Sequence, residues 1–177
     1  DHDNFFDSYE LRVQHEQLDL INNIKKLQQA LKDKNYAQHF KLGTNFEALY
    51  FEKHLYQPLL YLDAKAYRDI IQIQTVALNE GEKRFVEDLK QFYTANSAYF
   101  ADKELYLLRN KGKSGVAFFD SSGGFSPDFI LWLFSGDQQH ICFIDPKGFF
   151  NIGSLDHEKV RLHEKLKAEI EPKLADR

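Results

Sequence analysis

The spacing of apolar residues changes along the chain, from helical periodicity in the first 75 residues to short apolar runs after them. A first helix is predicted over residues 5–35, because apolar side chains recur at spacings of four, three and four, at Leu20, Ile24, Leu27 and Leu31. This spacing stacks side chains on one helix face. We expect a second, aromatic-rich helix over residues 46–55 and mostly helical structure over residues 59–73. Residues 1–75 are therefore predicted to form an N-terminal helical region.

Strand and turn signals dominate residues 76–177. A short strand from Ile71 is expected to end at Asn79, a favourable N-cap for a helix from residue 80 to about residue 93. Apolar runs predict strands over residues 104–108, 116–119, 128–134 and 140–144, separated by turns over residues 112–115, 121–124 and 135–137. A final helix is predicted over residues 156–174, where Leu162, Leu166 and Ile170 are spaced by four. The order helix, three to four strands, helix predicts an α/β core.

The composition fits one packed domain with an appendage. The 177 residues are 43% hydrophobic and include 16 Phe and 9 Tyr, which is enough apolar material for a folded core. A net charge of −4 excludes the strongly basic character typical of many nucleic-acid-binding domains, so any contact with DNA must be local. The stretch 105–119 has no acidic residue and contains Arg109, Lys111 and Lys113. These side chains are candidates for contacts with DNA phosphates or for an ordinary solvated loop.

Cysteine and methionine usage restricts the remaining possibilities. The single cysteine, Cys142, excludes an internal disulfide and a cysteine-based zinc site, and its apolar neighbours predict a buried side chain. No stretch reaches the length of about 20 apolar residues that crosses a membrane, and no signal peptide opens the sequence. We therefore expect a cytoplasmic protein. Since there is no methionine, even at position 1, we expect a fragment of a longer chain.

Two carboxylates at the ends of apolar strands are the strongest chemical signal. Asp128 opens the run 128–134, and Asp145 closes the run 140–144. A carboxylate in such a run is costly to bury unless a cation compensates it. Hard divalent cations such as magnesium favour carboxylate and carbonyl oxygens, so the two acids are candidate ligands of one ion. Because strand side chains alternate, Lys147 is expected on the same side as Asp145, beside an attacking water.

The same residues carry a resemblance to a known family. Pro127-Asp128 and Asp145-Pro146-Lys147 match the two motif elements of the PD-(D/E)xK nuclease superfamily. More narrowly, the stretches GEKRFVEDL, ELYLLRN, FSPDFILWL and FIDPKG resemble the nuclease domain at the end of helicase-containing restriction subunits, like those of type III systems. The resemblance covers residues 76–170. It implies a restriction-endonuclease-like core, in which a helix, three to four strands of a mixed sheet and a second helix follow one another.

The resemblance also implies a magnesium-dependent endonuclease that hydrolyses phosphodiester bonds of DNA. In this family the two acids bind magnesium, with manganese as a substitute, and these roles fall on Asp128 and Asp145. The residue between Asp145 and Lys147, Pro146, offers its backbone carbonyl to the metal, and Lys147 positions or activates the water. The implied partners are DNA, a helicase or translocase region in the same natural chain, and other subunits of a restriction system.

Two features of the family are missing from the sequence. The family's core adds another strand after the second helix, whereas this sequence stops at Arg177. No helicase motif is present either. A motor would have to lie upstream in the natural chain, and the missing strand would be disordered or outside the fragment.

A fourth site residue is expected on the helix before the strands, where members of the superfamily often place a glutamate. Glu80, Glu82 and Glu87 qualify by position. Only Glu82 shares the helix face of the apolar residues three, four, seven and eleven positions later, which are Phe85, Val86, Leu89 and Tyr93. Glu87 falls on the solvated side, and Glu80 suits the helix start because acids stabilise the N-terminal dipole. We therefore predict Glu82; a partly exposed glutamate at the edge of the apolar stripe is the alternative.

Three alternatives to this interpretation stay open. Pro-Asp and Asp-Pro-Lys-Gly are also ordinary turn sequences, although their joint placement on consecutive apolar strands favours a site. The chain is alternatively a catalytically silent DNA-binding or docking domain with the same fold. The third alternative, suggested by the long first helix, is a module that binds a partner protein. We therefore predict two regions: a helical linker or docking region over residues 1–75 and the nuclease core over residues 76–177.

Overall fold

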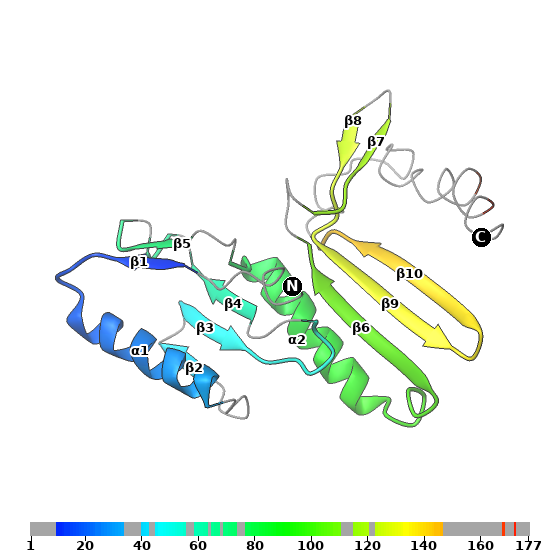
Figure 1. The fold of residues 1–177 in the computed structure, drawn as a ribbon, viewed down its shortest axis with the longest axis horizontal. Helices are drawn as coiled ribbons and strands as arrows, with labels where there is room; N and C mark the ends of the chain where they lie inside the picture. Colours follow the sequence, from blue (N-terminus) through cyan, green and yellow to red (C-terminus); the bar gives the residue numbers. More distant parts are fainter. Residues whose placement is uncertain are drawn as a thin grey trace.

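The computed structural model describes residues 10–33, 40–42, 45–55, 59–63, 65–67, 69–73, 77–110, 115–120, 123–146, 168 and 172. This part of the chain is a mixed α/β fold of two helices and small antiparallel sheets (Figure 1). Its elements, in chain order, are β1 (Leu11–Val13), α1 (Leu18–Lys32), β2 (Phe40–Leu42), β3 (Phe46–Leu49), β4 (Leu59–Leu62), β5 (Ile71–Ile73), α2 (Glu80–Ala95), β6 (Lys103–Arg109), β7 (Phe118–Asp120), β8 (Gly123–Phe125), β9 (Phe129–Ser135) and β10 (Gln138–Ile144). Neither helix is long and apolar enough to cross a membrane. The predicted final helix, apart from residues 168 and 172, lies outside the described residues.

Helix α2 packs with two three-stranded antiparallel sheets. We call β2-β3-β4 the N-terminal sheet and β10-β9-β6 the central sheet. Both sheets and α2 contribute to one hydrophobic core, whose fully buried members include Leu59 of β4, Val86 of α2 and Leu107 of β6. The core therefore takes side chains from both sides of the boundary predicted at residues 75 and 76.

The N-terminal sheet is covered on both faces. On one face, Phe46, Ala48 and Leu60 pack with Leu27 of α1. On the other face, Leu49 belongs to the core shared with α2. All four residues of β3 are buried as a result.

This two-sided burial explains why the helices predicted over residues 46–55 and 59–73 are wrong. β3 lies in the first stretch, and β4 and β5 lie in the second. A strand with one solvated face alternates apolar and polar residues, but a strand buried on both faces shows a continuous apolar run that is hard to distinguish from a buried helix. In the part that the structure describes, the predicted N-terminal helical region is thus one helix with two small sheets.

Only part of the first helix, predicted over residues 5–35, is helical. α1 begins at Leu18 and ends at Lys32, and its buried Leu20 and Leu27 confirm the predicted apolar face within these bounds. Before it, β1 pairs with β5, which lies far along the chain. A partner so distant in sequence leaves no periodic signal near β1, so the strand was indistinguishable from an extension of the helix.

Helix α2 confirms the helix predicted after Asn79. The Asn79 side chain accepts a hydrogen bond from the Glu82 backbone N–H at 3.1 Å. In return, Glu82 Oε2 accepts one from the Asn79 backbone N–H at 2.9 Å. This capping box satisfies two N–H groups that the first helical turn would otherwise leave open. The cap fixes where the helix begins and thereby where Glu82 lies.

The central sheet confirms three of the predicted strands. β9 lies in the middle, antiparallel to β6 and to β10. Gly136, in the turn from β9 to β10, has a φ of 58°, a conformation that glycine adopts without steric cost. On the other edge of β6, residues 53–55 form a parallel bridge: Leu55 N–H donates to the Leu107 oxygen at 2.9 Å, and Leu107 N–H donates to the Lys53 oxygen at 2.8 Å. The three strands of the central sheet are antiparallel to one another, whereas a mixed sheet was predicted; the parallel contact is an isolated bridge beside β6.

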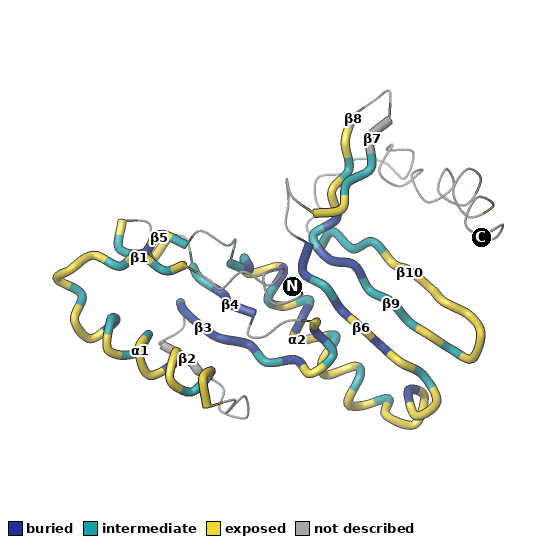
Figure 2. The backbone as a smooth tube through the Cα atoms, in the orientation of Figure 1, coloured by how far each residue is buried: buried dark blue, intermediate teal, exposed yellow. Residues whose placement is uncertain are grey.

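Two further predictions in this region are wrong. Gly123 and Gly124, expected in a turn, begin β8, which pairs with β7. The resulting hairpin projects from the end of the central sheet where β6 ends and β9 begins (Figure 1). Cys142, expected to be buried, is exposed. It lies on β10, the edge strand of the central sheet, whose first residues are all exposed (Figure 2).

Candidate functional site

The two predicted metal ligands flank a pair of neighbouring strands. Asp128 directly precedes β9, and Asp145 directly follows β10. The register pairs Ile144 with Phe129, so its continuation by one residue sets Asp145 opposite Asp128. Opposed positions of a regular antiparallel pair have Cβ atoms about 4.5–5.5 Å apart. The register thus places two acids, seventeen positions apart in sequence, at neighbouring strand ends. We call Asp128 and Asp145 the acid pair.

The turn before Asp128 is held by Asn110, which is 4% exposed. Its Nδ2 donates to the backbone oxygens of Val116 and Pro127, each at 2.8 Å. Its Oδ1 accepts from the Val116 backbone N–H at 2.9 Å, and its own backbone N–H donates to the Asp128 oxygen at 2.8 Å. The last bond continues the register of β6 and β9 by one residue. Asn110 therefore fixes the Pro-Asp turn at the base of the β7–β8 hairpin.

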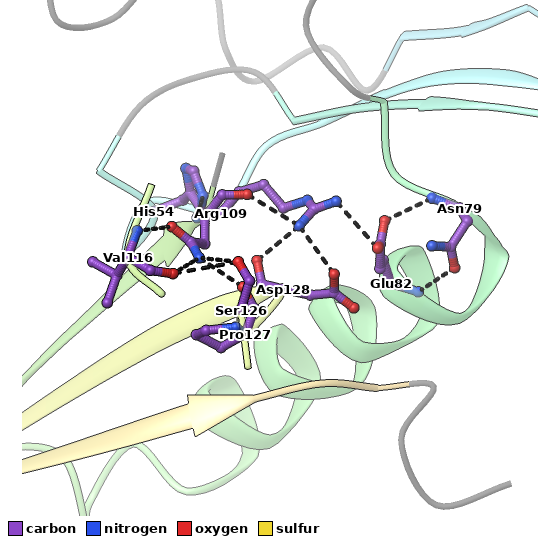
Figure 3. A network of polar contacts seen from close by, with 9 residues as sticks. His54, Asn79, Glu82, Arg109, Val116, Ser126, Pro127 and Asp128 are labelled. Carbon is purple, nitrogen blue, oxygen red and sulfur yellow. Dashed lines mark hydrogen bonds and ion pairs between the residues drawn. The ribbon is translucent and has the colours of Figure 1, made fainter. Parts of the chain in front are cut away.

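Arg109 lies at the centre of the site, with its guanidinium between Glu82 and Asp128 (Figure 3). Its Nη2 donates to Glu82 Oε1 at 3.1 Å, and its Nη1 donates to the Asp128 backbone oxygen at 2.8 Å. Nη1 also lies 3.6 Å from Asp128 Oδ1, which is an ion pair but too long for a hydrogen bond. The guanidinium further lies over the Phe129 ring, 5.2 Å from its centroid, an arrangement that favours a cation. The positive charge of Arg109 is therefore stabilised by Glu82, by Asp128 and by the Phe129 ring.

Glu82 faces inward, as predicted. It is 1% exposed, whereas the side chain of Glu87 is 45% exposed and that of Glu80 is 82% exposed. One of its oxygens accepts from Asn79 in the capping box, and the other accepts from Arg109. A buried carboxylate requires such partners because an uncompensated charge is strongly destabilising away from water.

His54 holds the backbone of Arg109. This histidine is 4% exposed, and its Nε2 accepts a hydrogen bond from the Arg109 backbone N–H at 2.8 Å. An Nε2 that accepts carries no proton, so the imidazole is neutral with its proton on Nδ1. Because His54 belongs to residues 53–55, the parallel neighbour of β6 also helps to position the site.

A second ion pair, between a partly exposed lysine and a buried glutamate, involves the next residue of α2. Lys83 Nζ donates to Glu47 Oε2 on β3, and Glu47 is 2% exposed. Lys83 also lies over the Tyr61 ring, 4.7 Å from its centroid. Burial lowers the pKa of Lys83, but the hydrogen bond and charge of Glu47 raise it more, so this pKa lies above its ordinary value. The pair joins α2 to the N-terminal sheet.

Sequence reasoning missed the roles of His54, Arg109 and Asn110 in this network. The expectation that Arg109 is a loop charge is wrong, since it is the last residue of β6 and is 8% exposed. A signal was present: Arg-Asn ends an apolar strand, in the same way that Asp145 ends another. His54 offered no comparable signal, because its partner is 55 positions away. Three predicted site residues, Lys111, Lys113 and Lys147, lie outside the described residues.

The donors at the strand ends fit a hard divalent cation. The acid pair offers carboxylate oxygens, and Pro146, next to Asp145, offers a backbone carbonyl. Within the described ranges, no group of three or more His, Cys, Asp or Glu side chains is suited to hold a metal. Magnesium does not require such a group, because it often uses one or two carboxylates and keeps several waters. The donor set therefore fits magnesium, and it does not resemble the four-ligand cage of a structural zinc.

Comparison of the chain with protein-family models, curated proteins and solved structures finds no match. The functional assignment therefore depends on the geometry of the strand ends and on the motifs of the sequence.

Proposed function

We propose that this chain is a magnesium-dependent nuclease that hydrolyses phosphodiester bonds of DNA and has a restriction-endonuclease-like core. The observation that carries the proposal is the register of β9 and β10, whose continuation sets Asp145 opposite Asp128. The order of α2, β6, β9 and β10 supports it, because a helix followed by three neighbouring strands is the arrangement that the motif requires. Glu82 on α2 supports it as well, since it lies next to this end of the sheet through Arg109.

Each residue of the proposed site has a separate task. Asp128, Asp145 and the carbonyl of Pro146 would hold magnesium, which when bound supplies Lewis-acid stabilisation of the phosphate and a nucleophile at neutral pH. Lys147 would stabilise the negative charge that develops on the attacking oxygen and on the phosphate. Because a protonated lysine has only hydrogen-bond donors, Lys147 would not bind the metal itself. Glu82 completes the site from α2.

The proposed substrate and context follow from the same motifs. DNA is the proposed partner, and the chain would be the nuclease part of a larger restriction protein that also carries a helicase or translocase region. Lys111 and Lys113 follow Asn110 in sequence, so they are the proposed contacts to DNA phosphates. Removal of such contacts would weaken binding of every DNA sequence about equally.

One observation favours a second function, a catalytically silent DNA-binding or docking domain with the same fold. The guanidinium of Arg109 lies 3.1 Å from Glu82 and 3.6 Å from Asp128, and it offsets charge that a metal would otherwise offset. A silent domain, however, has no need for Asp145 and Lys147 at the motif spacing. We therefore prefer the nuclease.

Cleavage of plasmid DNA by the purified chain, with magnesium or with a chelator, tests the proposal. We expect nicking that requires magnesium, and we expect Asp128→Ala or Asp145→Ala to reduce it about a thousand-fold, since metal stabilisation of the transition state amounts to several kcal/mol. Folding and most DNA binding should persist in both variants. Asp88→Ala, at an exposed position of α2, is the matched control. Parental cleavage rates in both site variants would show that the metal site is assigned wrongly. A folded parent that binds DNA without cleaving it would support the silent domain.

A further inference from the structure

We propose that Arg109 is a positioning residue for the acid pair and that Glu82 acts through Arg109 instead of binding the metal. This inference rests on the proposed nuclease site, and it assigns roles that the motif does not contain. The structural basis of the inference is a series of hydrogen bonds from the Asn79 backbone to Glu82, from Arg109 to Glu82, and from Arg109 to the Asp128 backbone.

Arg109 joins the ends of three elements. Its hydrogen bond to Asp128 is made to the backbone oxygen at 2.8 Å, and a longer one reaches the Asn110 oxygen at 3.3 Å. Its other terminal nitrogen binds Glu82 on α2. The planar guanidinium holds its donors in a fixed fork, so the two sides cannot move independently. The position of the Asp128 backbone is therefore tied to the first turn of α2.

Glu82 is suited to anchor Arg109 and poorly suited to bind a metal. Its Oε2 accepts from the Asn79 N–H that begins the helix, and its Oε1 accepts from Arg109. Because both oxygens already accept hydrogen bonds and the side chain is 1% exposed, coordination of a metal would compete with the capping box and with the ion pair. At Asp128, by contrast, Arg109 donates its hydrogen bond to the backbone oxygen and lies 3.6 Å from the carboxylate. Asp128 is therefore the ligand and Glu82 the anchor.

Burial also separates Arg109 from a phosphate contact. The residue is 8% exposed, and its charge already faces Glu82 and Asp128. A phosphate contact requires a guanidinium that reaches solvent, since phosphates of the duplex lie outside the protein surface. Loss of Arg109 should therefore disturb the acid pair and leave DNA affinity nearly unchanged.

Amide hydrogen exchange tests the positioning without metal or substrate. The Asn110 N–H donates to the Asp128 oxygen and so reports on the turn, whereas the Leu107 N–H, bonded to Lys53, reports on the rest of β6. Arg109→Gln leaves Glu82 buried without its cation and therefore also lowers the free energy of unfolding, which speeds exchange at both amides. Beyond this common change, we expect exchange at Asn110 to become about tenfold faster relative to Leu107, because the turn opens locally. Glu82→Gln should also speed exchange at Asn110, but should add nothing in the Arg109→Gln background. Equal changes at Asn110 and Leu107, or additive effects of the two substitutions, would overturn the inference.

Magnesium calorimetry separates an anchor from a ligand. Glu82→Gln should bind magnesium within about threefold of the parent, whereas Asp128→Asn should weaken it more than about tenfold, because only the second change removes a coordinating oxygen. Equal losses in the two variants would make Glu82 a ligand and overturn the inference. If the parent binds no magnesium, the proposed function fails, and the exchange experiment still decides the role of Arg109.

The third test measures the kinetics of cleavage and the salt dependence of duplex binding. Arg109→Gln should lower kcat about tenfold with KM changed less than about threefold, since the residue orients the acids and does not hold DNA. The dependence of duplex binding on salt should keep its slope, whereas loss of about one unit would identify a phosphate contact and overturn the inference. Arg109→Lys should restore only part of kcat, because an ammonium cannot span Glu82 and the Asp128 backbone as a fork does.

Discussion

Two adjacent residues of α2, Glu82 and Lys83, form ion pairs with buried residues of different sheets. Only one of the two partners, Arg109, makes a further contact with a strand-end acid. Lys83 pairs with Glu47 of the N-terminal sheet, and that contact joins two layers of the fold. Glu82 pairs with Arg109 of the central sheet, whose guanidinium continues to Asp128 at the strand end. The two glutamates are almost equally buried, at 1% for Glu82 and 2% for Glu47. Burial and pairing alone therefore do not distinguish a stabilising contact from a functional one.

The contact of Arg109 with Asp128, at a strand end, distinguishes the Glu82–Arg109 pair from the Lys83–Glu47 pair. The charges of Lys83 and Glu47 join two layers of the fold, and removal of either charge should change the free energy of unfolding. Charge arranged around the proposed metal position would contribute to chemistry, and its removal should then change the cleavage rate of the folded protein. Substitutions in the two regions should therefore separate stability from activity.

The largest expected effect contrasts two lysines. Lys147→Ala should lower cleavage by at least about a hundredfold while magnesium binding persists, because the lost interaction is made mainly in the transition state. Lys83→Met should leave the rate per folded molecule unchanged. Magnesium calorimetry beside a plasmid-nicking assay measures both quantities. Should Lys147→Ala lose magnesium affinity as severely as Asp145→Ala, the lysine supports the site and does not take part in the chemistry.

The next effect is on stability and concerns the ion pair between Lys83 and Glu47. Lys83→Met should destabilise the fold by about 3 kcal/mol, because it leaves the Glu47 carboxylate buried without its cation. Adding Glu47→Gln should recover most of this loss, since no buried charge then remains. Urea unfolding followed by circular dichroism gives both free energies. A double variant as unstable as the single one would show that the lysine acts through its packing on Tyr61 and not through charge.

A smaller effect compares two glutamates of the same helix. Glu82→Gln should lower the cleavage rate about tenfold, because the amide cannot hold Arg109 as an ion pair does. Glu87→Gln, on the exposed side of α2, should stay within about twofold of the parent, as most surface substitutions do. Initial rates at saturating magnesium make the comparison. Equal losses at the two positions would refute the selection of Glu82 by its helix face.

The smallest effect concerns the cap that holds Glu82. Asn79→Ala should reduce stability by about 1 kcal/mol, the usual contribution of an N-cap side chain. It should lower cleavage less than Glu82→Gln does, because the Asn79 backbone N–H still binds the Glu82 carboxylate. Asn96→Ala, at the exposed other end of α2, is the control for helix stability alone. If Asn79→Ala loses more activity than Glu82→Gln, the cap has a role in the site beyond its contribution to the helix.

Local signals account for what the sequence predicted well. Asn79 marks the start of α2, and Gly136 marks the turn between β9 and β10, so this half of the fold followed from neighbouring residues. The placement of Asp128 and Asp145 at neighbouring strand ends followed for the same reason, since each lies at one end of an apolar run. These signals need no knowledge of distant contacts.

Distant contacts account for what the sequence did not reveal. β3 lacks alternation because a helix covers each of its faces, and β1 is defined by its partner β5. Arg109 meets Glu82 from 27 positions away, so nothing in its own segment shows that its charge is buried. The number of apolar residues on a strand predicts burial, but the identity of the covering element depends on the whole fold.

The short parallel bridge between residues 53–55 and β6 also covers one edge of the central sheet. Strands at the edge of a sheet offer unpaired N–H and C=O groups to other chains, and hydrophobic edges are recurrent sites of aggregation. Here the backbone of Lys53 and Leu55 occupies those groups at Leu107, which is fully buried. A chain shortened to residues 76–177 would uncover this edge and remove Phe51 and Leu59 from the core. The N-terminal region thus covers an edge of the central sheet and contributes to its core, so we expect the two regions to fold as one unit.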